Sequence, residues 1–198
     1  MSDLDYATLV DVKDRMGVTG TDRDDELTGK ITVASRRIDR DTGRRFYLDA
    51  SANARVLGAA GRLVWTDDGE KLLVPDIGSE TITVEVGVGS TWTTVDSSLW
   101  EAGGYRPFDD GWAIEWITMI GGAWNVPSGE RVRITTQWGW PAKPAPIGEA
   151  CLLLTQRLAR RKDSPEGVAS YAEGAVMRVS RYDPDYDAFI GAYVLEGA

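Results

Sequence analysis

The chain of 198 residues has no histidine, a single cysteine and no long apolar run. Without histidine it lacks the commonest general base and metal ligand, together with the Ser-His and Cys-His nucleophile pairs. One cysteine excludes a disulfide within the chain and a zinc site built from several cysteines. This residue, Cys151, lies in an apolar helical pattern and is predicted to be a buried core residue. Catalysis would have to depend on carboxylates, lysine or an oxygen-ligated metal.

Signals for membranes, secretion and nucleic acid are scarce as well. The most apolar run, residues 150–154, is too short to span a bilayer. The acidic N-terminus has no apolar signal region, so we expect a protein made in the cytoplasm. The net charge is −9, which gives no general electrostatic reason to bind nucleic acid tightly. The charge suits a protein that DNA passes without sticking, although solubility explains it equally well.

Apolar residues at helical spacing predict two helices near the N-terminus. We expect a short helix over residues 2–16, ended by Gly17, and a longer one over residues 24–41, ended by Gly43. Gly29 weakens the longer helix by about 1 kcal/mol relative to Ala. Its apolar face has spacings of four, three and four: Leu27, Ile31, Ala34 and Ile38.

The C-terminal part also predicts helices. Prolines at 141, 144 and 146 indicate a stiff junction without helix, and residues 147–162 then give the best helical pattern of the chain. Residues 163–181 predict a long loop or extended arm. Asp183-Pro184 has the form of an N-cap followed by a first-turn proline, which opens a last helix. The last helix has an aromatic stripe: Tyr182, Tyr186, Phe189 and Tyr193.

The middle of the chain, from about residue 53 to 138, has a different character. Residues 81–86 and 131–138 alternate polar and apolar side chains, which predicts half-buried strands. Turn signals separate further candidates at 62–65, 72–74, 90–95 and 113–117. Several short strands at this spacing predict a small antiparallel sandwich or barrel.

These segments predict an α+β fold class. The helices on either side of the β region each have one apolar face and too few partners without each other, so the β region is an insertion. We therefore expect a small bundle of about four helices with a large inserted antiparallel β sandwich or barrel-like region. Residues 1–50 form the first half of the helical module and 51–140 the inserted β region. Residues 141–198 form the second half, with an arm and a C-terminal helix.

No constellation of residues predicts a catalytic, metal or cofactor site. The acidic pairs at 67–68 and 109–110 adjoin turns, where Asp is favoured by its bonds to the backbone. Asp183, Asp185 and Asp187 alternate like a calcium loop, but the glycine and closing glutamate of that motif are missing. Neither a phosphate-binding loop nor a nucleophile elbow occurs in the sequence. We therefore expect no enzyme activity, no cofactor and no metal.

Tryptophan and arginine are clustered in different parts of the sequence. All eight tryptophans lie between residues 65 and 140. Packing of a sandwich core and of subunit contacts is favoured over a sugar-stacking face, because Trp buries a large area on pleated surfaces. Two basic clusters lie outside this region, and interleaved aspartates favour ion pairs over nucleic-acid contact. The clusters are Arg36, Arg37, Arg40, Arg44 and Arg45, and Arg157, Arg160, Arg161 and Lys162.

Two sequence patterns carry a resemblance to a known family. In the first, a helix contains Ala34-Ser35-Arg36 and Ile38-Asp39 and is closed by Thr42-Gly43-Arg44 and Phe46. In the second, Trp138-Gly139-Trp140-Pro141 precedes a helix opened by Pro146-Ile147 and closed by Arg161-Lys162-Asp163-Ser164-Pro165. The pattern covers a little over half of the chain and resembles the head-to-tail adaptor (connector, or head completion) proteins of tailed bacteriophages. The large β region departs from the shortest members of that family.

The resemblance implies a structural protein of the virion neck, between capsid and tail, made in the host cytoplasm. Such proteins form a ring of about twelve copies on the portal protein through heterologous contacts. The ring extends the channel for genomic DNA without sequence-specific binding, and presents a docking surface for stopper or tail-terminator proteins. No membrane is involved. The alternative is a monomeric carbohydrate- or protein-binding β module of a phage or cell surface.

The resemblance also implies that residues 168–193 form a docking arm for the portal or the adjacent subunit. Aromatic and arginine side chains are favoured at such interfaces. The candidate interface residues are Tyr171, Met177, Arg178, Tyr182, Tyr186, Phe189, Arg157, Arg160 and Arg161. Alternatively, the last helix packs on the helical module of its own chain.

Overall fold

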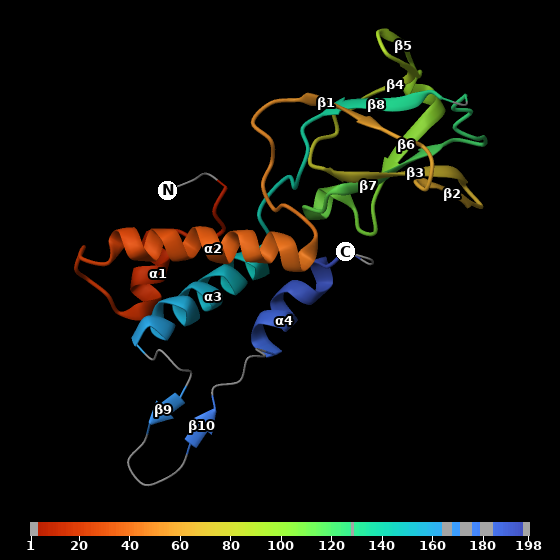
Figure 1. The fold of residues 1–198 in the computed structure, drawn as a ribbon. Helices are drawn as coiled ribbons and strands as arrows, with labels where there is room; N and C mark the ends of the chain where they lie inside the picture. Colours follow the sequence, from red (N-terminus) through yellow and green to blue (C-terminus); the bar gives the residue numbers. More distant parts are fainter. Residues whose placement is uncertain (1–3, 128, 164–167, 171–175, 179–183, 196–198) are drawn as a thin grey trace. The chain divides into compact units, whose positions relative to one another are not determined.

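The computed structural model describes residues 4–127, 129–163, 168–170, 176–178 and 184–195. The chain divides into two compact units (Figure 1). The helical unit combines residues 1–44 with residues 143–198, and the β unit is the continuous stretch 45–142. Helices α1–α4 belong to the helical unit and strands β1–β8 to the β unit, which confirms the predicted α+β class.

The helical unit contains α1 (Leu9–Met16), α2 (Asp24–Thr42), α3 (Ala145–Asp163) and α4 (Pro184–Ile190), with a 3-10 turn, η3 (Gly191–Tyr193), after α4. Helix α3 contacts each of the other three helices, and α1 also contacts α2. Between α3 and α4 in sequence, β9 (Val168–Ser170) pairs antiparallel with β10 (Val176–Arg178). The stretch predicted as a long loop or extended arm over 163–181 thus contains two short paired strands, which local composition does not reveal because pairing depends on a partner segment.

Local signals set the ends of α1 and α3. The Thr8 hydroxyl accepts a hydrogen bond from the Asp11 N–H at 3.1 Å, so Thr8 is the N-cap and the predicted start at residue 2 is wrong. Gly17 ends α1 in the left-handed conformation, as predicted. Helix α3 begins at Ala145 with Pro146 in its first turn, where no backbone N–H is needed, so the proline junction ends earlier than predicted.

The predicted apolar stripe of α2 packs against α3. Leu27, Ile31, Ala34 and Ile38 of α2 and Ile147, Ala150 and Cys151 of α3 are all fully buried. Ser35 Oγ lies 3.5 Å from Cys151 Sγ, which places the two helices in direct contact. Each large aliphatic side chain buried in this way contributes about 1.5–3 kcal/mol relative to exposure. Packing therefore holds α2 together despite Gly29.

The β unit contains two antiparallel four-stranded sheets, ordered β1-β8-β4-β5 and β2-β3-β7-β6. The strands of the first sheet are β1 (Asn53–Leu57), β8 (Arg131–Thr136), β4 (Thr83–Val88) and β5 (Thr91–Thr94). Those of the second are β2 (Leu63–Thr66), β3 (Gly69–Ile77), β7 (Ile114–Met119) and β6 (Trp100–Gly103). The 3-10 turns η1 (Ser97–Leu99) and η2 (Phe108–Asp110) precede β6 and β7. All six predicted strands are confirmed, whereas β1 and β6 are additional.

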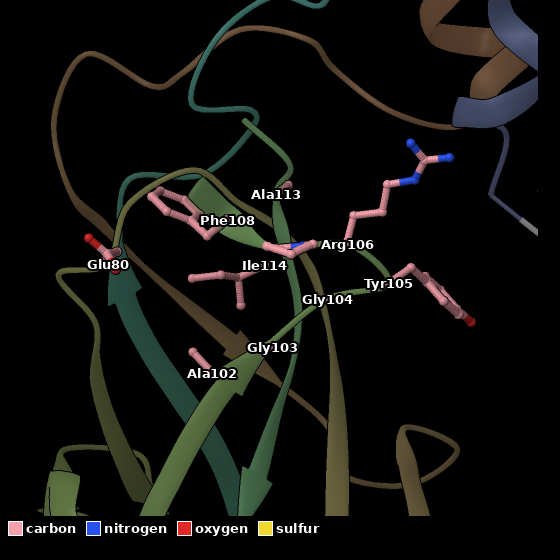
Figure 2. Close-up of a pocket in the computed structure, with 10 residues that line it drawn as sticks. Glu80, Ala102, Gly103, Gly104, Tyr105, Arg106, Phe108, Ala113 and Ile114 are labelled. Atoms are coloured by element: carbon pink, nitrogen blue, oxygen red, sulfur yellow. The ribbon is translucent and has the colours of Figure 1, made fainter. Parts of the chain in front are cut away.

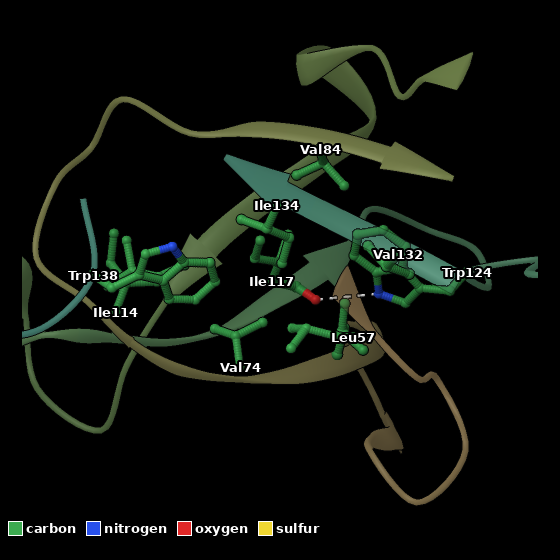
Figure 3. Packing of buried hydrophobic residues seen from close by; sticks show 11 residues of the cluster. Leu57, Val74, Val84, Ile114, Ile117, Trp124, Val132, Ile134 and Trp138 are labelled. Carbon is green, nitrogen blue, oxygen red and sulfur yellow. Dashed lines mark hydrogen bonds between the residues drawn. The ribbon is translucent and has the colours of Figure 1, made fainter. Parts of the chain in front are cut away.

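Both sheets contribute side chains to one apolar core (Figure 3). Leu72 and Ile117 come from one sheet, and Val84 and Ile134 from the other; all four are buried. Trp124 follows β7 and donates its indole N–H to the carbonyl of Ile117 at 3.2 Å. Inward-facing residues from two sheets that alternate with outward-facing ones define a sandwich, as the sequence predicts.

Among the described residues, no helix combines the length and the apolar character needed to cross a membrane.

Candidate functional site

A tyrosine–carboxylate contact holds the C-terminal helix α4 on α2. Tyr186 Oη donates a hydrogen bond to Asp41 Oδ2 at 3.0 Å, and the Tyr186 residue is only 6% exposed. Asp41 also pairs with Arg37 at 3.2 Å and Arg40 at 2.8 Å. The Arg37 guanidinium lies 5.9 Å from the centre of the Tyr186 ring. Tyr186, a candidate interface residue, thus has its side chain inside the helical unit.

These contacts shift the pKa values of both partners. Burial raises the pKa of Asp41, but hydrogen bonds from Arg40, Tyr186 and Arg37 outweigh burial, so the pKa lies below its ordinary value. Burial is also the main cause that raises the pKa of Tyr186, and the hydrogen bond to Asp41 raises it further. At neutral pH the pair therefore consists of a carboxylate acceptor and a neutral phenol donor, which is the state that the hydrogen bond requires.

Two contacts to the backbone fix the end of the described chain beside the C-terminus of α2. Arg44 Nε donates to the carbonyl of Tyr193 at 2.9 Å, and the Leu195 N–H donates to the carbonyl of Thr42 at 2.9 Å. Gly43 between them adopts the left-handed conformation that ends α2, as predicted. Arg44 is buried, so this member of the first basic cluster serves the fold of the helical unit.

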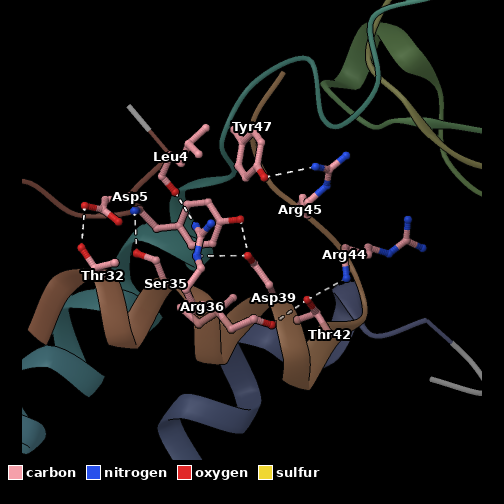
Figure 4. A network of polar contacts seen from close by, with 12 residues as sticks. Leu4, Asp5, Thr32, Ser35, Arg36, Asp39, Thr42, Arg44, Arg45 and Tyr47 are labelled. Carbon is pink, nitrogen blue, oxygen red and sulfur yellow. Dashed lines mark hydrogen bonds and ion pairs between the residues drawn. The ribbon is translucent and has the colours of Figure 1, made fainter. Parts of the chain in front are cut away.

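The first basic cluster forms ion pairs with the aspartates interleaved in it, as predicted. Besides the Asp41 pairs, Arg36 Nε lies 3.3 Å from Asp39 Oδ2. Asp39 also accepts a hydrogen bond from the Tyr6 hydroxyl, and Lys143 Nζ donates to the Tyr6 carbonyl at 2.7 Å. Figure 4 shows the polar contacts around this site. No local pattern in the sequence marks Tyr6, because its partners lie far away in the chain.

The remaining candidate residues of the helices lie at the ends of α3 and α4. Arg157 is half-buried and Arg160 is exposed near the C-terminus of α3, and Arg161 belongs to the same helix. Phe189 is half-buried on α4. Cations at a helix C-terminus are stabilised by the helix dipole, so this position alone accounts for an arginine-rich end.

The other candidates belong to the segment between α3 and α4. Met177 and Arg178 lie in β10, opposite β9. Tyr171 and Tyr182 lie outside the described residues. The structure thus brings Tyr186 together with Asp41, while the interface assigned to the other residues stays a prediction.

The β unit has a pocket of about 440 Å³ beside the end of β6 (Figure 2). Ala113 and Ile114 form a buried apolar floor together with the half-buried Phe108. Glu80 contributes an exposed carboxylate, and the Tyr105 ring is turned away from the floor. Polar and apolar groups both line the pocket, and its volume suits the insertion of one side chain over the apolar floor.

An aromatic pair lies beside this pocket. Tyr105 is 79% exposed and meets the Trp116 ring edge to face, with the centroids 5.3 Å apart. Lys71 Nζ lies 4.6 Å from the centre of the Trp116 ring. Exposed aromatic rings with a neighbouring cation are typical of contact surfaces rather than of a sandwich core.

The tryptophans divide between core and surface. Trp124, Trp138 and Trp140 are buried, as core packing predicts, and Trp140 contacts the rings of Phe46 and Trp112 at 5.1 Å each. Trp65 on β2, by contrast, is 67% exposed. Core packing therefore accounts for the buried tryptophans, and the predicted use of others in subunit contacts stays a prediction.

The metal-ligating and nucleophilic side chains of the described residues are dispersed or buried. Within it, no group of three or more His, Cys, Asp or Glu side chains is placed to hold a metal ion. Cys151 is buried between α2 and α3, and burial raises the pKa of its thiol, which disfavours the reactive thiolate. Asp109 and Asp110 lie exposed in η2, in keeping with the predicted turn.

The whole fold is similar to chains in two solved particle structures. One, described as the neck of an empty GTA particle computed with C6 symmetry, shares 18% identity with a TM-score of 0.58. The match covers 98% of this chain and 93% of that one. The other, the virion of a native gene transfer agent (GTA) particle, shares 20% identity with a TM-score of 0.53, over 94% and 88% of the two chains. No known family profile and no curated protein sequence matches the chain.

Proposed function

We propose that this chain is a head-to-tail adaptor of a phage-like particle, which binds the portal protein as a ring of about twelve copies. The full-length fold similarity to a chain in a particle neck carries the proposal. That neck is described with C6 symmetry. A ring of twelve equal copies has twelvefold symmetry, which includes sixfold symmetry, so the two are compatible. The role is structural, with no reaction to catalyse.

The charge of the chain supports a place around a DNA channel. With a net charge of −9, the chain has no overall tendency to hold the phosphate backbone as DNA passes. The arginines of α2 that could contact phosphate are instead paired with Asp39 and Asp41. Such a charge distribution suits a ring that extends the DNA channel. In the proposal, the same ring offers a docking surface to stopper or tail-terminator proteins.

In this proposal the portal and the neighbouring copies are contacted by the end of α3 and by the segment up to α4. The contacting residues are Arg157, Arg160, Arg161, Tyr171, Met177, Arg178, Tyr182 and Phe189. Tyr186 contributes indirectly, because its hydrogen bond to Asp41 holds α4 on α2.

Electron microscopy of the chain mixed with the portal ring of the same virus tests the proposal. We expect one added symmetric layer on the portal. A truncation after Pro165 should abolish that layer, whereas the variant Trp65→Ala should leave it intact. Portal rings that remain bare at saturating concentrations of the full chain would contradict the adaptor role.

Two exposed aromatic residues support a second candidate function. Trp65 and Tyr105 are 67% and 79% exposed, and exposed rings can stack on sugars or on a protein partner. A monomeric binding module would show ligand-dependent quenching of tryptophan fluorescence and would form no layer on the portal. The Trp65→Ala variant would lose such quenching.

A further inference from the structure

Strand β6 presents an open edge. Among the described residues it is the outermost strand of the order β2-β3-β7-β6 and pairs with β7 alone. The Ile120 N–H donates to the Leu99 carbonyl at 2.9 Å, so these residues form a hydrogen-bonded pair just before β6. Hydrogen-bonded and non-hydrogen-bonded pairs alternate along antiparallel strands. Trp100 and Ala102 are therefore in non-hydrogen-bonded pairs, and their backbone N–H and C=O groups point away from β7. A further strand can therefore pair with β6 at these two residues.

The two faces at this edge differ in chemistry. Ala102 lines the 440 Å³ pocket, whose floor is apolar. Glu101, the neighbouring residue, is exposed and belongs to the opposite face. The ring of Trp116 covers Gly103 on that face, where a Cβ would lie 2.6 Å from Trp116 Nε1. A strand added here would thus place one side chain over the apolar floor of the pocket and the next beside the Glu101 carboxylate, which favours a cation.

The chain itself contains a strand with these properties. Strand β10 pairs only with β9 among the described residues, and a two-stranded sheet is at best marginally stable by itself. Its residues Met177 and Arg178 are adjacent, so an apolar and a basic position fall on opposite faces of the strand. The β unit carries thirteen acidic and seven basic residues, so a basic strand complements it in charge.

We infer that β10 of one copy pairs with the open edge of β6 in the next copy, with Met177 in the pocket and Arg178 beside Glu101 and Tyr105. This joins two different surfaces, and such a heterologous contact is what closes a cyclic ring. The backbone bonds supply affinity, and the pocket and the carboxylate supply specificity. The inference rests on the proposed ring and names the contact between its subunits.

Disulfide trapping between differently sized copies tests this contact. In a Cys151→Ala background, one full-length copy carries Ala102→Cys and the other, with a longer tag, carries Met177→Cys. Oxidation of the mixture should give the mixed dimer, since paired strands bring Cβ atoms within disulfide range. A chain that carries both cysteines should give a ladder of linked copies. The matched control replaces Ala102→Cys by Thr93→Cys, on the outermost strand β5 of the other sheet, and should give only background linkage.

A charge exchange tests the specificity of the trapped contact. Glu101→Lys should lower the yield of the mixed dimer at least about fivefold, through repulsion from Arg178. Arg178→Glu in the other copy should restore the yield, which a general loss of folding would not allow. If the yield falls without restoration, Arg178 does not face Glu101 and the inferred register is wrong.

The other outcomes separate this inference from the adaptor role when the same variants are mixed with the portal ring. A portal layer without the mixed dimer overturns the strand pairing alone. A mixed dimer without a portal layer retains the pairing and overturns the portal role. If the double-cysteine chain links only within itself, β10 pairs with its own β6 and the contact between copies is wrong.

Discussion

The helical unit and the β unit differ in what holds distant parts of the chain together. In the β unit, a continuous stretch of chain closes around apolar side chains from two sheets. The helical unit joins segments that the whole β unit separates, and polar contacts cross between them. Lys143 bonds to the Tyr6 carbonyl, Arg15 pairs with Glu149 at 2.7 Å, and Tyr186 bonds to Asp41. Apolar packing of α2 against α3 joins the separated segments of the helical unit, and these polar pairs add contacts between the same segments.

The two units can also be observed separately. All eight tryptophans lie in the β unit, whereas all four α-helices of the described chain lie in the helical unit. Tryptophan fluorescence therefore follows the β unit, and circular dichroism at the helix band follows the helical unit.

The largest effect is expected from Trp138→Ala in the β unit. Trp138 is fully buried, its indole N–H donates to the Asn53 carbonyl at 2.9 Å, and Arg55 lies 4.4 Å from its ring centre. The cavity should lower the free energy of unfolding by about 3–5 kcal/mol in urea titrations followed by fluorescence. The matched variant Trp65→Ala, at an exposed site, should change it by less than about 0.5 kcal/mol. Equal losses in both variants would contradict the assignment of Trp138 to the core.

The helical counterpart is Ile31→Ala. Ile31 belongs to the stripe of α2 that packs on α3, and it is fully buried. Its truncation should lower the free energy of unfolding by about 2–5 kcal/mol in the transition followed by circular dichroism. Val33→Ala on the exposed face of the same helix is the control. The fluorescence transition should keep its midpoint in both variants. If both probes shift together for Ile31→Ala, the two units unfold in one cooperative transition. Separate free energies of unfolding for the two units would then be contradicted.

The sequence predicts those helices and strands whose apolar residues repeat with the period of the backbone. The stripe of α2 and the strand at residues 131–136 are visible because burial repeats with the period of the backbone, and the structure buries the expected residues. Strands β1 and β6 are not predicted, because the alternation in Asn53-Ala54-Arg55-Val56 and Trp100-Glu101-Ala102-Gly103 is short and relies on alanine and glycine, which are depleted in strands. Pairing with β8 and β7 decides their conformation.

The candidate site is less predictable than the fold. The aromatic stripe predicts Tyr186 as an interface residue, yet its hydroxyl bonds to Asp41, 145 positions away. The pocket beside β6 likewise combines Glu80, Ala102 and Ile114, which no spacing rule groups together. Such contacts arise from tertiary packing, which a local pattern does not encode. The interface assigned to Arg157, Arg160 and β10 therefore stays a prediction.

A smaller effect, with a pH signature, is expected from Tyr186→Phe. A hydrogen bond to a charged group contributes about 1.5–3 kcal/mol, so the helical unit should lose that much at pH 7. Because the pKa of Asp41 is lowered on folding, its contribution is present above the unfolded value of 3.8 and is lost as the pH falls through the lower folded value. Without the Tyr186 bond the lowering is smaller, so the acid-induced loss of stability should shrink.

Two further variants, Tyr105→Phe and Asp41→Asn, bracket the pH dependence expected for Tyr186→Phe. Tyr105→Phe removes the hydroxyl of an exposed tyrosine in the β unit and should alter neither the stability at pH 7 nor its acid dependence. Asp41→Asn should abolish the contribution of Asp41 to the acid dependence altogether. An unchanged acid profile in Asp41→Asn would show that other carboxylates govern acid unfolding of the helical unit.

The smallest effect should be a gain, in Gly29→Ala. Gly29 lies inside α2, and an added Cβ would meet no atom within 4 Å, so the alanine brings helix propensity without a clash. The gain should be about 0.5–1 kcal/mol by circular dichroism, with no change in fluorescence. Gly17→Ala gives the opposite sign, because φ at that position is +67° and strains any side chain. If Gly29→Ala instead destabilises α2, that face of the helix is covered in solution, as a neighbouring copy in a ring would cover it.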